Sequence, residues 1–576
     1  MNLIAQTVAS SGFGPLSAII FLPLLFAVVL MFIPKVFVSI HRYVALLATV
    51  VTFIGSLTLV QGFSGNTFHF QFLEQVSWIP QLGIGYKVGI DGISLWLVLL
   101  TTFIGIIAVW FSFYVRERSK EFMIFLLILQ TAMTGVFCSL DLIQFYVFFE
   151  ATLIPMYFLI AIWGGGNRSY AAIKFFLYTF LGSIFMLVAI IVLYFMAKSK
   201  LGYGTFDLME LQALAARGEL AVGSAQMWLF AAFALAFAVK VPFFPVHTWL
   251  PDAHTEAPTA GSIVLAAIML KMGTYGFLRF CLPLFPEASI QAAPTMMVLA
   301  VIGIIYGAIM AAVQPDWKRL VAYSSVSHLG FVMLGIFSLN HNGITGGVLQ
   351  SINHGISTGA LFLMVGMIYE RTHTRLFADY GGLKRQMPIF AALFLIIMLS
   401  SVGLPSMNGF IGEFLCMMGS FQAAFEGTLG IPIWVPVLSG AGVVLAAVYL
   451  LWMYQKVFYG ANDKPANFRL RDIKPWEQAC VGLLIVFVFW MGLFPTFFTV
   501  KMETSINAVR QQTMLPAELR PIWSDKNVDI NLSGEVVEAS NRDPENLGQW
   551  DQGRVIAPAN QIKQFSETAV AQRVQR

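Results

Sequence analysis

The chain has 576 residues, of which 58% are hydrophobic and only 11% are charged, with a net charge of +4 at pH 7. Soluble domains carry about 25% charged residues, so this composition excludes an ordinary soluble protein. The 64 charged side chains are unevenly spread, with 45 in residues 1–500 and 19 in residues 501–576. We therefore expect a body embedded in the lipid bilayer, a polar C-terminal extension over residues 501–576, and no nucleic-acid partner.

A membrane-spanning helix needs about 20 mostly apolar residues, and the sequence predicts about fourteen of them in an all-α, polytopic fold. The first apolar run is interpreted as a retained helix, because the first fourteen residues contain no Lys or Arg to form the basic region of a signal peptide. The predicted helices begin near Pro15, Tyr43, Gly89, Phe122, Leu142, Ile173, Met227, Pro258, Pro294, Leu320, Gly343, Pro388, Trp434 and Ala479.

Two of these segments contain helix breakers. In the seventh, Pro242 and Pro245 follow Lys240 and remove backbone donors. In the twelfth, the run from Gly403 to Gly409 precedes Glu413. Backbone N–H and C=O groups that lose their helical partners at membrane depth must be satisfied by protein or by a water-filled cavity. Paired broken helices are typical of inverted-repeat transporters; two ordinary proline kinks are the alternative.

The broken helices are the fourth members of two blocks of five helices, which suggests a division of the chain into five parts. These parts are three N-terminal helices (1–120), a first five-helix repeat (121–285), a second five-helix repeat (290–460), a last spanning helix (461–500) and the polar extension (501–576).

The distribution of basic residues predicts the orientation. Loops after odd-numbered helices hold eighteen Lys or Arg, counting Lys174 at a helix edge, whereas loops after even-numbered helices hold five. Because positively charged loops stay in the cytoplasm, both termini are expected on the outer, periplasmic side.

Four ionisable residues lie inside apolar segments: Glu150, Lys240, Lys271 and Glu413. A charge at the centre of a spanning helix costs about 2.5–3.5 kcal/mol, so these residues are expected to serve a path for protons or ions. A Glu–Lys pair has protonation states that neighbouring charges can switch. The alternative for Glu150 and Lys240 is a static ion pair that locks two helices together.

Two histidines lie in polar stretches of apolar segments. His328 is in YSSVSHLG and His354 is in QSINHGIST, where Thr358 follows one helical turn later. A neutral histidine can accept and donate a proton, so both are candidates for a proton relay. Hydrogen-bonded packing residues are the equal alternative, and a bis-histidine haem site is a poor third.

The chain offers little for a metal or cofactor. Its four cysteines are widely scattered and form no CxxC or Cys/His cluster, so we expect no metal site, no iron–sulfur cluster and no cofactor in this chain. His247, Asp252, His254 and Glu256 resemble metal ligands by type, but they lie in a proline-rich connection where capping and hinge roles are favoured. Asp141 and Lys174 lie near segment ends and are expected to form surface or interhelix pairs.

At these residues the chain resembles the antiporter-like membrane subunits of respiratory NADH:quinone oxidoreductase (complex I) and its relatives. The resemblance covers about residues 80–460. Its strongest block is KVPFFPVHTWLPDAHTEAPTAGSIVLAAIMLKMGTYGFLR, and YKVGIDGISLW, FFEATLIPMY, PDWKRLVAYSSVSHLGFV, NHGISTGALFL and GLPSMNGFIGEF support it.

This resemblance implies fourteen helices with two inverted five-helix repeats. It also implies an entry pair at Glu150 and Lys240, a central lysine at Lys271, relay histidines at His328 and His354, and a terminal ionisable residue at Glu413. Three paralogous subunits share this plan, and Glu413 favours the paralogue that carries glutamate rather than lysine in its twelfth helix. The extension 501–576 departs from the usual pattern and resembles a partly disordered tail or an arm along neighbouring subunits.

The function implied is proton translocation in a multi-pass subunit of the bacterial inner membrane. Quinone reduction would occur in other subunits, and the partners would be membrane-arm subunits, including paralogous antiporter-like ones. Two alternatives stay open: a subunit of a multisubunit sodium/proton antiporter, and a structural subunit that translocates nothing.

Overall fold

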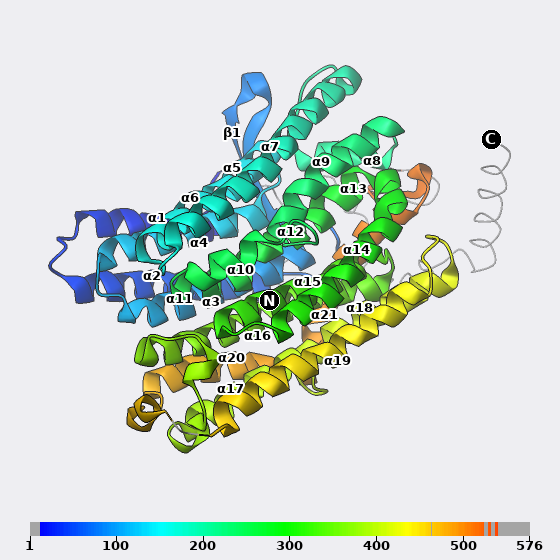
Figure 1. Cartoon of the computed structure of the whole chain (residues 1–576). Coiled ribbons are helices and arrows are strands. Elements are labelled where there is room, and N and C mark those ends of the chain that lie inside the picture. The colour runs from blue at the N-terminus through cyan, green and yellow to red at the C-terminus, as the bar shows by residue number, and fades with distance from the viewer. Residues whose placement is uncertain (1–11, 462–463, 523–527, 531–535, 539–576) are drawn as a thin grey trace, which may run out of the picture. The chain divides into compact units, whose positions relative to one another are not determined.

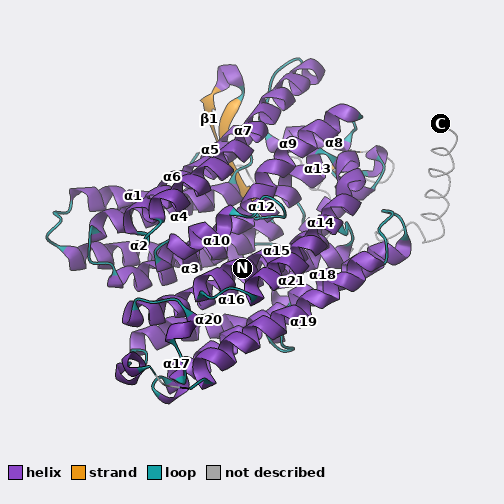
Figure 2. Cartoon of the chain, in the orientation of Figure 1, coloured by secondary structure: helices purple, strands orange, loops and turns teal. Residues whose placement is uncertain are grey.

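The computed structural model describes residues 12–461, 464–522, 528–530 and 536–538, and helices dominate it (Figures 1 and 2). The N-terminal half contains α1 (Pro15–Phe32), α2 (Val38–Gly62), α3 (Gly92–Phe111), α4 (Ser119–Cys138), α5 (Leu142–Ala151), α6 (Leu153–Trp163), α7 (Arg168–Leu201), α8 (Leu208–Ala216), α9 (Ser224–Lys240) and α10 (Trp249–Glu256). Next come α11 (Thr259–Val264), α12 (Leu270–Gly276), α13 (Leu282–Leu284), α14 (Pro286–Ala312), α15 (Trp317–Phe337), α16 (His341–Thr372), α17 (Pro388–Val402), α18 (Asn408–Glu426), α19 (Trp434–Tyr454), α20 (Pro475–Leu493) and α21 (Thr496–Met514).

The all-α, polytopic class predicted from the sequence is confirmed. Within the described residues, twelve helical spans are long and apolar enough to cross a membrane, and α9 and α17 are shorter apolar helices. A helix begins near every predicted start, and the largest offset is at Pro294, because α14 already begins at Pro286. The count of fourteen, the inverted repeats and the five-part division stay predictions.

Burial separates an inner set of helices from an outer set. In the spans Thr259–Leu284 and His341–Thr372, 100% of the most apolar window is buried, against 39% for α7 and for the span that begins with α19. Figure 1 shows α7 and α19 on opposite flanks of the bundle, with α15 and α16 between them. The apolar outer faces are suited to contact lipid or other membrane chains, whereas Lys271, His328 and His354 lie on inner helices.

Both predicted helix breaks are present. The seventh segment divides into α9 and α10 at Val241–Thr248, and the twelfth divides into α17 and α18 at Gly403–Met407. A one-residue interruption at Thr152 separates α5 from α6, although Thr152 keeps helical dihedral angles and the fifth segment forms a single span. This interruption was not predicted, although Pro155 lies in the first turn of α6, where proline is tolerated and a continuous helix is not favoured.

A β-hairpin between α2 and α3 was also not predicted. Strands β1 (Gln71–Ile79) and β2 (Ile84–Ile90) pair antiparallel, and they are the orange arrows of Figure 2. Glu74 on β1 is buried and accepts hydrogen bonds from the backbone N–H groups of Leu16 (2.7 Å) and Ser17 (3.0 Å). A carboxylate is favourable there because the first N–H groups of α1 lack helical partners.

The polar extension begins later than the sequence predicts. Residues 501–514 complete α21, which packs on the chain itself: the backbone N–H of Gly92 donates to Ser505 Oγ (3.0 Å) and Trp96 Nε1 donates to the carbonyl oxygen of Phe498 (3.1 Å). A Cβ at Gly92 would lie 2.1 Å from the carbonyl oxygen of Lys501, so only glycine permits this approach. This first stretch is therefore helical, so the prediction of a partly disordered tail is wrong for it, while an arm along neighbouring subunits stays a prediction.

Beyond residue 523 the chain forms a separate unit, in which β3 (Val528–Ile530) pairs antiparallel with β4 (Val536–Glu538). The remainder of the predicted extension and residues 1–11 lie outside the described residues.

Candidate functional site

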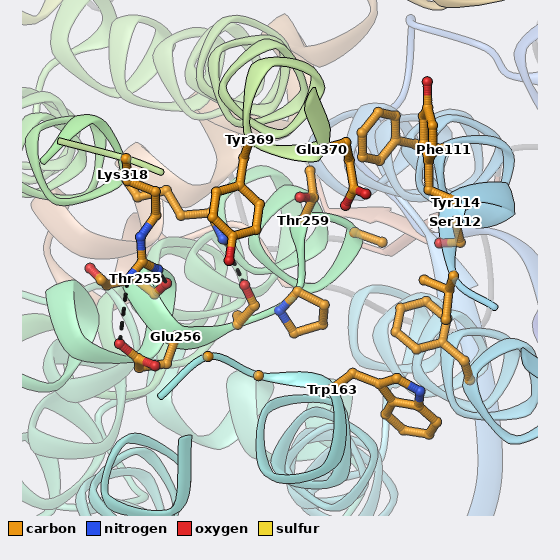
Figure 3. A pocket seen from close by; sticks show the side chains of 18 residues that line it. Phe111, Ser112, Tyr114, Trp163, Thr255, Glu256, Thr259, Lys318, Tyr369 and Glu370 are labelled. Atoms are coloured by element: carbon orange, nitrogen blue, oxygen red, sulfur yellow. Dashed lines mark hydrogen bonds and ion pairs between the residues drawn. The ribbon is translucent and has the colours of Figure 1, made fainter. Parts of the chain in front are cut away.

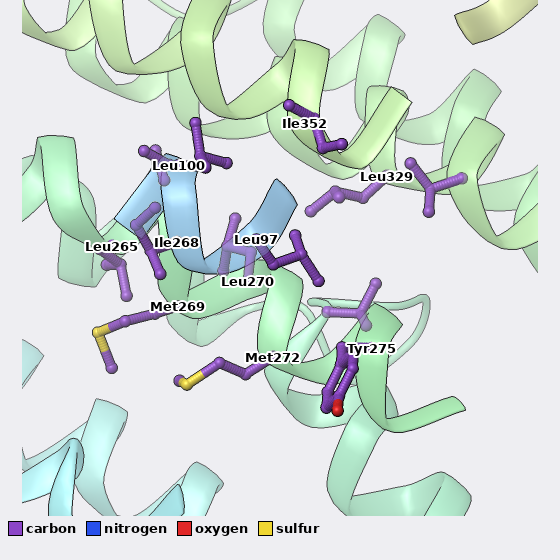
Figure 4. Close-up of a cluster of buried hydrophobic side chains, with 14 of the residues drawn as sticks. Leu97, Leu100, Leu265, Ile268, Met269, Leu270, Met272, Tyr275, Leu329 and Ile352 are labelled. Atoms are coloured by element: carbon purple, nitrogen blue, oxygen red, sulfur yellow. The ribbon is translucent and has the colours of Figure 1, made fainter. Parts of the chain in front are cut away.

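Lys271 lies wholly buried at the centre of the inner helices. Its helix α12 is flanked by two π-helical turns, Leu265–Met269 and Phe277–Cys281. Figure 4 shows the apolar side chains around this stretch, including Leu97 from α3 and Ile352 from α16. The ammonium group donates to the carbonyl oxygen of Ala266 (2.5 Å), which lies in the first π turn. Single π turns are frequent at functional sites, and this one places a backbone acceptor against the lysine.

The second contact of Lys271 is the predicted relay histidine on α16. Lys271 Nζ lies 2.6 Å from Nδ1 of His354. With the lysine protonated, Nδ1 accepts this hydrogen bond and the ring carries its proton on Nε2. The two side chains come from segments 83 residues apart. The structure therefore brings Lys271 into direct contact with His354.

His328 on α15 forms the corresponding pair with the terminal glutamate. Its Nδ1 lies 2.7 Å from Oε1 of Glu413 on α18, and both side chains are buried. Gln350 Nε2 donates to the same oxygen at 3.0 Å. The rings of His328 and His354 have their centroids 5.9 Å apart, which is too far for a direct hydrogen bond between them.

A small polar cavity of about 10 Å³ lies between the two pairs, lined by His328, His354, Gln350, Asn353 and Glu413 among others. Four buried atoms of its lining side chains have no hydrogen-bond partner in the described part of the chain: Nε2 of both histidines, Oε1 of Gln350 and Oδ1 of Asn353. Buried polar groups are rarely left unsatisfied, and a polar cavity of about this size holds one water. The cavity therefore has room for one water between the two histidine pairs.

The predicted entry pair differs from expectation. Lys240, the last residue of α9, donates to Thr152 Oγ1 (3.2 Å) and lies 4.6 Å from the ring centroid of Phe149. No ion pair within 4 Å joins it to Glu150 in the described residues, and Oε1 of Glu150 has no hydrogen-bond partner there. The two groups still interact electrostatically. The alternative of a locked ion pair is wrong in this structure, because the ammonium of Lys240 donates to the hydroxyl of Thr152 instead.

Side chains satisfy the backbone at both predicted breaks. Trp249 Nε1 donates to the carbonyl oxygen of Val239 (2.9 Å) at the end of α9. At the second break, Ser400 Oγ donates to Asn408 Oδ1 (2.5 Å), and Asn353 Nδ2 donates to the carbonyl oxygen of Asn408 (2.7 Å). Side chains of the protein thus provide hydrogen-bond partners at both breaks, as backbone groups at membrane depth require.

The polar cluster between the seventh and eighth predicted helices forms no candidate metal site, and no group of three possible ligands occurs among the described residues. Lys174 pairs with Asp252 at 2.7 Å, which confirms the interhelix pair expected of Lys174. His254 does not act as a cap: it is fully buried, stacks on Phe362 at 4.4 Å, and neither ring nitrogen has a hydrogen-bond partner in the described chain.

Sequence reasoning missed the amides of this site. Gln350, Asn353 and Asn408 position or bridge the titratable groups, yet none was singled out. A signal existed, because Gln350, Asn353 and His354 lie at positions i, i+3 and i+4 and therefore share one face of an apolar helix.

The fold and this site define a polytopic helical membrane protein with a buried line of ionisable and histidine side chains. A family model described as NADH:quinone oxidoreductase/Mrp antiporter matches residues 139–435. The chain belongs to this family.

Among relatives, the chain is 46% identical over 466 residues to NADH-quinone oxidoreductase subunit M of Rhodobacter capsulatus, covering 80% of this chain and 88% of that one. It is similar to a chain of respiratory complex I from Thermus thermophilus with bound NADH, with a TM-score of 0.77 and 32% identity over 86% of this chain and 99% of that one. A chain of the Mrp complex from Dietzia sp. DQ12-45-1b shares the fold, with a TM-score of 0.74 and 18% identity over 87% of this chain and 98% of that one. Glu413 favoured the paralogue that carries glutamate in its twelfth helix, and the similarity to subunit M agrees with this expectation.

Proposed function

We propose that this chain is a membrane subunit of NADH:quinone oxidoreductase that translocates protons in response to quinone reduction elsewhere in the complex. The observation that carries the proposal is the line Lys271–His354–cavity–His328–Glu413, in which each member has a partner at 2.6–2.7 Å or faces the shared cavity.

This line has the chemistry that proton transfer needs. The lysine can give a proton to His354 Nδ1 when the imidazole releases its Nε2 proton toward the cavity, and His328 can receive a proton from the cavity and pass one to Glu413. Because the surroundings are apolar, charges on the line act on one another more strongly than in water. A change at Glu150 and Lys240 is therefore expected to alter the potential at Lys271 and, through it, at Glu413.

The antiporter alternative is weaker. The Mrp neighbour supports only a shared fold at 18% identity, whereas the relative named subunit M shares 46% over most of both chains. The structural alternative explains buried ion pairs, but it does not explain why two histidines, a glutamate and two amides line one polar cavity.

We further propose that the chain holds no redox centre, so that hydride and electron chemistry belong to other subunits. The four cysteines are buried and far apart in sequence, which supports this view. The excess of basic residues in the loops after odd-numbered helices supports outer placement of both termini.

Two experiments test the proposal. Purification of the native complex should recover peripheral NADH- and flavin-binding chains; recovery of other antiporter subunits alone would contradict it. In proteoliposomes, His354→Gln and His328→Gln retain a hydrogen-bonding side chain that cannot titrate, so both should lower NADH-driven proton pumping by about 10²-fold. Native pumping by both variants would favour the structural alternative.

A further inference from the structure

Five basic side chains gather where the α1–α2 connection meets the α3–α4 connection, at the end of the bundle that the loop charges predict to be cytoplasmic. We call them the basic rim: Lys35, Arg42, Arg116, Arg118 and Lys120. The two lysines are bound within the chain, because Lys35 pairs with Glu121 at 2.7 Å and Lys120 Nζ donates to the carbonyl oxygen of Met31 at 2.6 Å. The three arginines are the part of the rim that can bind something else.

Arg42, in the second turn of α2, is held against the α3–α4 connection. Its Nη2 donates to the carbonyl oxygen of Val115 at 2.8 Å, and its guanidinium carbon lies 6.0 Å from the ring centroid of Phe113. This is the only hydrogen bond of its side chain within the described residues, whereas a guanidinium has five N–H donors. Arg42 is partly exposed, so donors remain for a ligand that approaches along the outside of α2.

Arg116 follows the carbonyl that Arg42 binds, and the two arginines interact electrostatically. Arg116 and Arg118 are exposed, and neither side chain has a hydrogen bond or an ion pair within 4 Å in the described chain. Glu117 between them is outnumbered by the three arginines. Like charges that lie close together without a counter-charge repel each other, so this corner of the molecule favours an anion.

The connection that binds Arg42 is fixed from the inside of the bundle. Figure 3 shows Phe111, Ser112 and Tyr114 along one side of a cavity of about 170 Å³. Tyr114 Oη donates to Oε1 of Glu477 on α20 at 2.9 Å. The backbone acceptor at Val115 is therefore held in place before any ligand binds, which reduces the ordering that binding requires.

The outer face of α2 continues from the arginines as an apolar stripe. Only 33% of the most apolar window of this helix is buried. Its exposed apolar side chains recur every three or four residues and so share one face: Ile40, Tyr43, Leu47, Val51 and Ile54. The ring of Tyr43 contacts Phe113, with 5.6 Å between the centroids, and tyrosine is typical of the level of the lipid headgroups. The positive corner thus lies at the headgroup end of a hydrocarbon-facing surface.

We propose that this corner binds an anionic phospholipid, with the phosphodiester between Arg42 and Arg116 and an acyl chain along the stripe of α2. Arginine binds phosphate oxygens through paired N–H donors, and basic clusters beside a spanning helix attract anionic lipids. One such molecule supplies both the negative charge and the hydrocarbon that this surface lacks, whereas a helix of a neighbouring chain would have to bring its own acids to this depth. The proposal needs no proton transfer and is independent of the proposed function.

The first experiment uses the native complex in phosphatidylcholine vesicles that contain a trace of photoactivatable lipid. Phosphatidylglycerol carrying a diazirine in its acyl chain should label peptides of α2 about fivefold more than the matching phosphatidylcholine, as read by mass spectrometry. Equal labelling by the two lipids would overturn the proposal, because the headgroup charge would then not matter. Absence of labelling on α2 by either lipid would show that another chain covers this face, and would also overturn it.

An excess of inorganic phosphate, added to the same vesicles, distinguishes a lipid from a free anion. Phosphate has no acyl chain to occupy the stripe, so it should leave the labelling unchanged. Displacement of phosphatidylglycerol by phosphate would overturn the proposal in favour of a site for free phosphate.

The second experiment removes the two guanidinium groups together. Arg42→Gln with Arg116→Gln should lower the labelling of α2 by phosphatidylglycerol to the level of phosphatidylcholine. Arg168→Gln is the matched control and should keep native labelling: Arg168 lies at the same predicted end and donates to one backbone carbonyl, that of Ile162 (3.0 Å). Native labelling in the double variant would overturn the proposal. If the double variant fails to assemble, the comparison of lipids on the native complex still decides.

Discussion

Asn353 and Asn408 hold each other across the second helix break. Asn353 Nδ2 donates to the carbonyl oxygen of Asn408 (2.7 Å), and Asn408 Nδ2 donates to the carbonyl oxygen of Asn353 (3.2 Å). Asn353 is also the neighbour of His354 on α16, whereas Asn408 begins α18, which carries Glu413. This reciprocal pair therefore ties the break to the helix that carries the relay histidine.

Asn408→Ala should lower the stability of this region. The substitution removes the donor to the Asn353 carbonyl and the acceptor for the Ser400 hydroxyl, and leaving buried partners unsatisfied costs about 1–3 kcal/mol each. We expect the complex to lose pumping at a lower temperature in thermal-inactivation assays. Asn342→Ala, which removes a part-buried bond to Gln422 near the start of α16, is the control and should leave the inactivation temperature near native.

Glu150→Gln should lower quinone-linked turnover strongly while the complex still assembles. No direct ion pair with Lys240 is lost, so packing should survive, but the electrostatic influence on the lysine disappears. Native gels would report assembly and NADH:quinone assays would report turnover. Glu121→Gln, which removes a surface pair with Lys35, should leave turnover unchanged. Native turnover in an assembled Glu150→Gln complex would limit Glu150 to a packing role.

Substitutions of Glu413 should separate titration from hydrogen bonding. Glu413→Ala and Glu413→Gln both remove the titrating group that accepts from Gln350 and contacts His328, so both should lower pumping by about 10²-fold. Glu413→Asp should retain part of the activity, because a shorter carboxylate still titrates. Glu426→Gln at the end of the same helix is the control. Pumping by Glu413→Gln at the native rate would show that only the hydrogen bonds matter.

The sequence predicted the membrane class, the breaks at Pro242 and Pro405, and the ionisable residues, because each is a local departure from an apolar run. It could not predict that Lys271 contacts His354 or that His328 contacts Glu413, since these pairs are 83 and 85 residues apart and depend on helix packing. The sequence also predicted a pair between Glu150 and Lys240, whereas in the structure Lys240 donates to the hydroxyl of Thr152. It did not predict that α21 packs against the N-terminal helices, because this packing depends on hydrogen bonds to residues far away in the sequence, such as Gly92.

Asp141 should give the complex a pH-dependent component of stability. It caps α5 through the backbone N–H groups of Ile143 and Gln144, and burial raises the pKa of its carboxyl from 3.8 to about 6. Between these values the folded chain holds a proton that the unfolded chain releases, so the free energy of unfolding falls as the pH rises through this window and is constant above it.

Acidification from about pH 7 to about pH 5 should therefore stabilise the native complex against heat more than it stabilises Asp141→Asn. Asparagine keeps an acceptor for the cap and does not titrate. Thermal inactivation at the two pH values, compared between native and variant complexes, measures the difference. Identical pH dependence in the two would place the carboxyl of Asp141 in contact with solvent.

The most direct test of the account is the proton-pumping yield of Lys271 variants in the reconstituted complex, measured per NADH oxidised. Lys271 Nζ contacts Nδ1 of His354 at 2.6 Å and is the buried cation at the head of the line. Lys271→Ala removes it, and Lys271→Arg keeps a positive charge that does not release its proton, so the account predicts that both variants lose pumping. Pumping by Lys271→Arg at the native rate and yield would show that a fixed charge suffices, and would contradict proton transfer through this side chain.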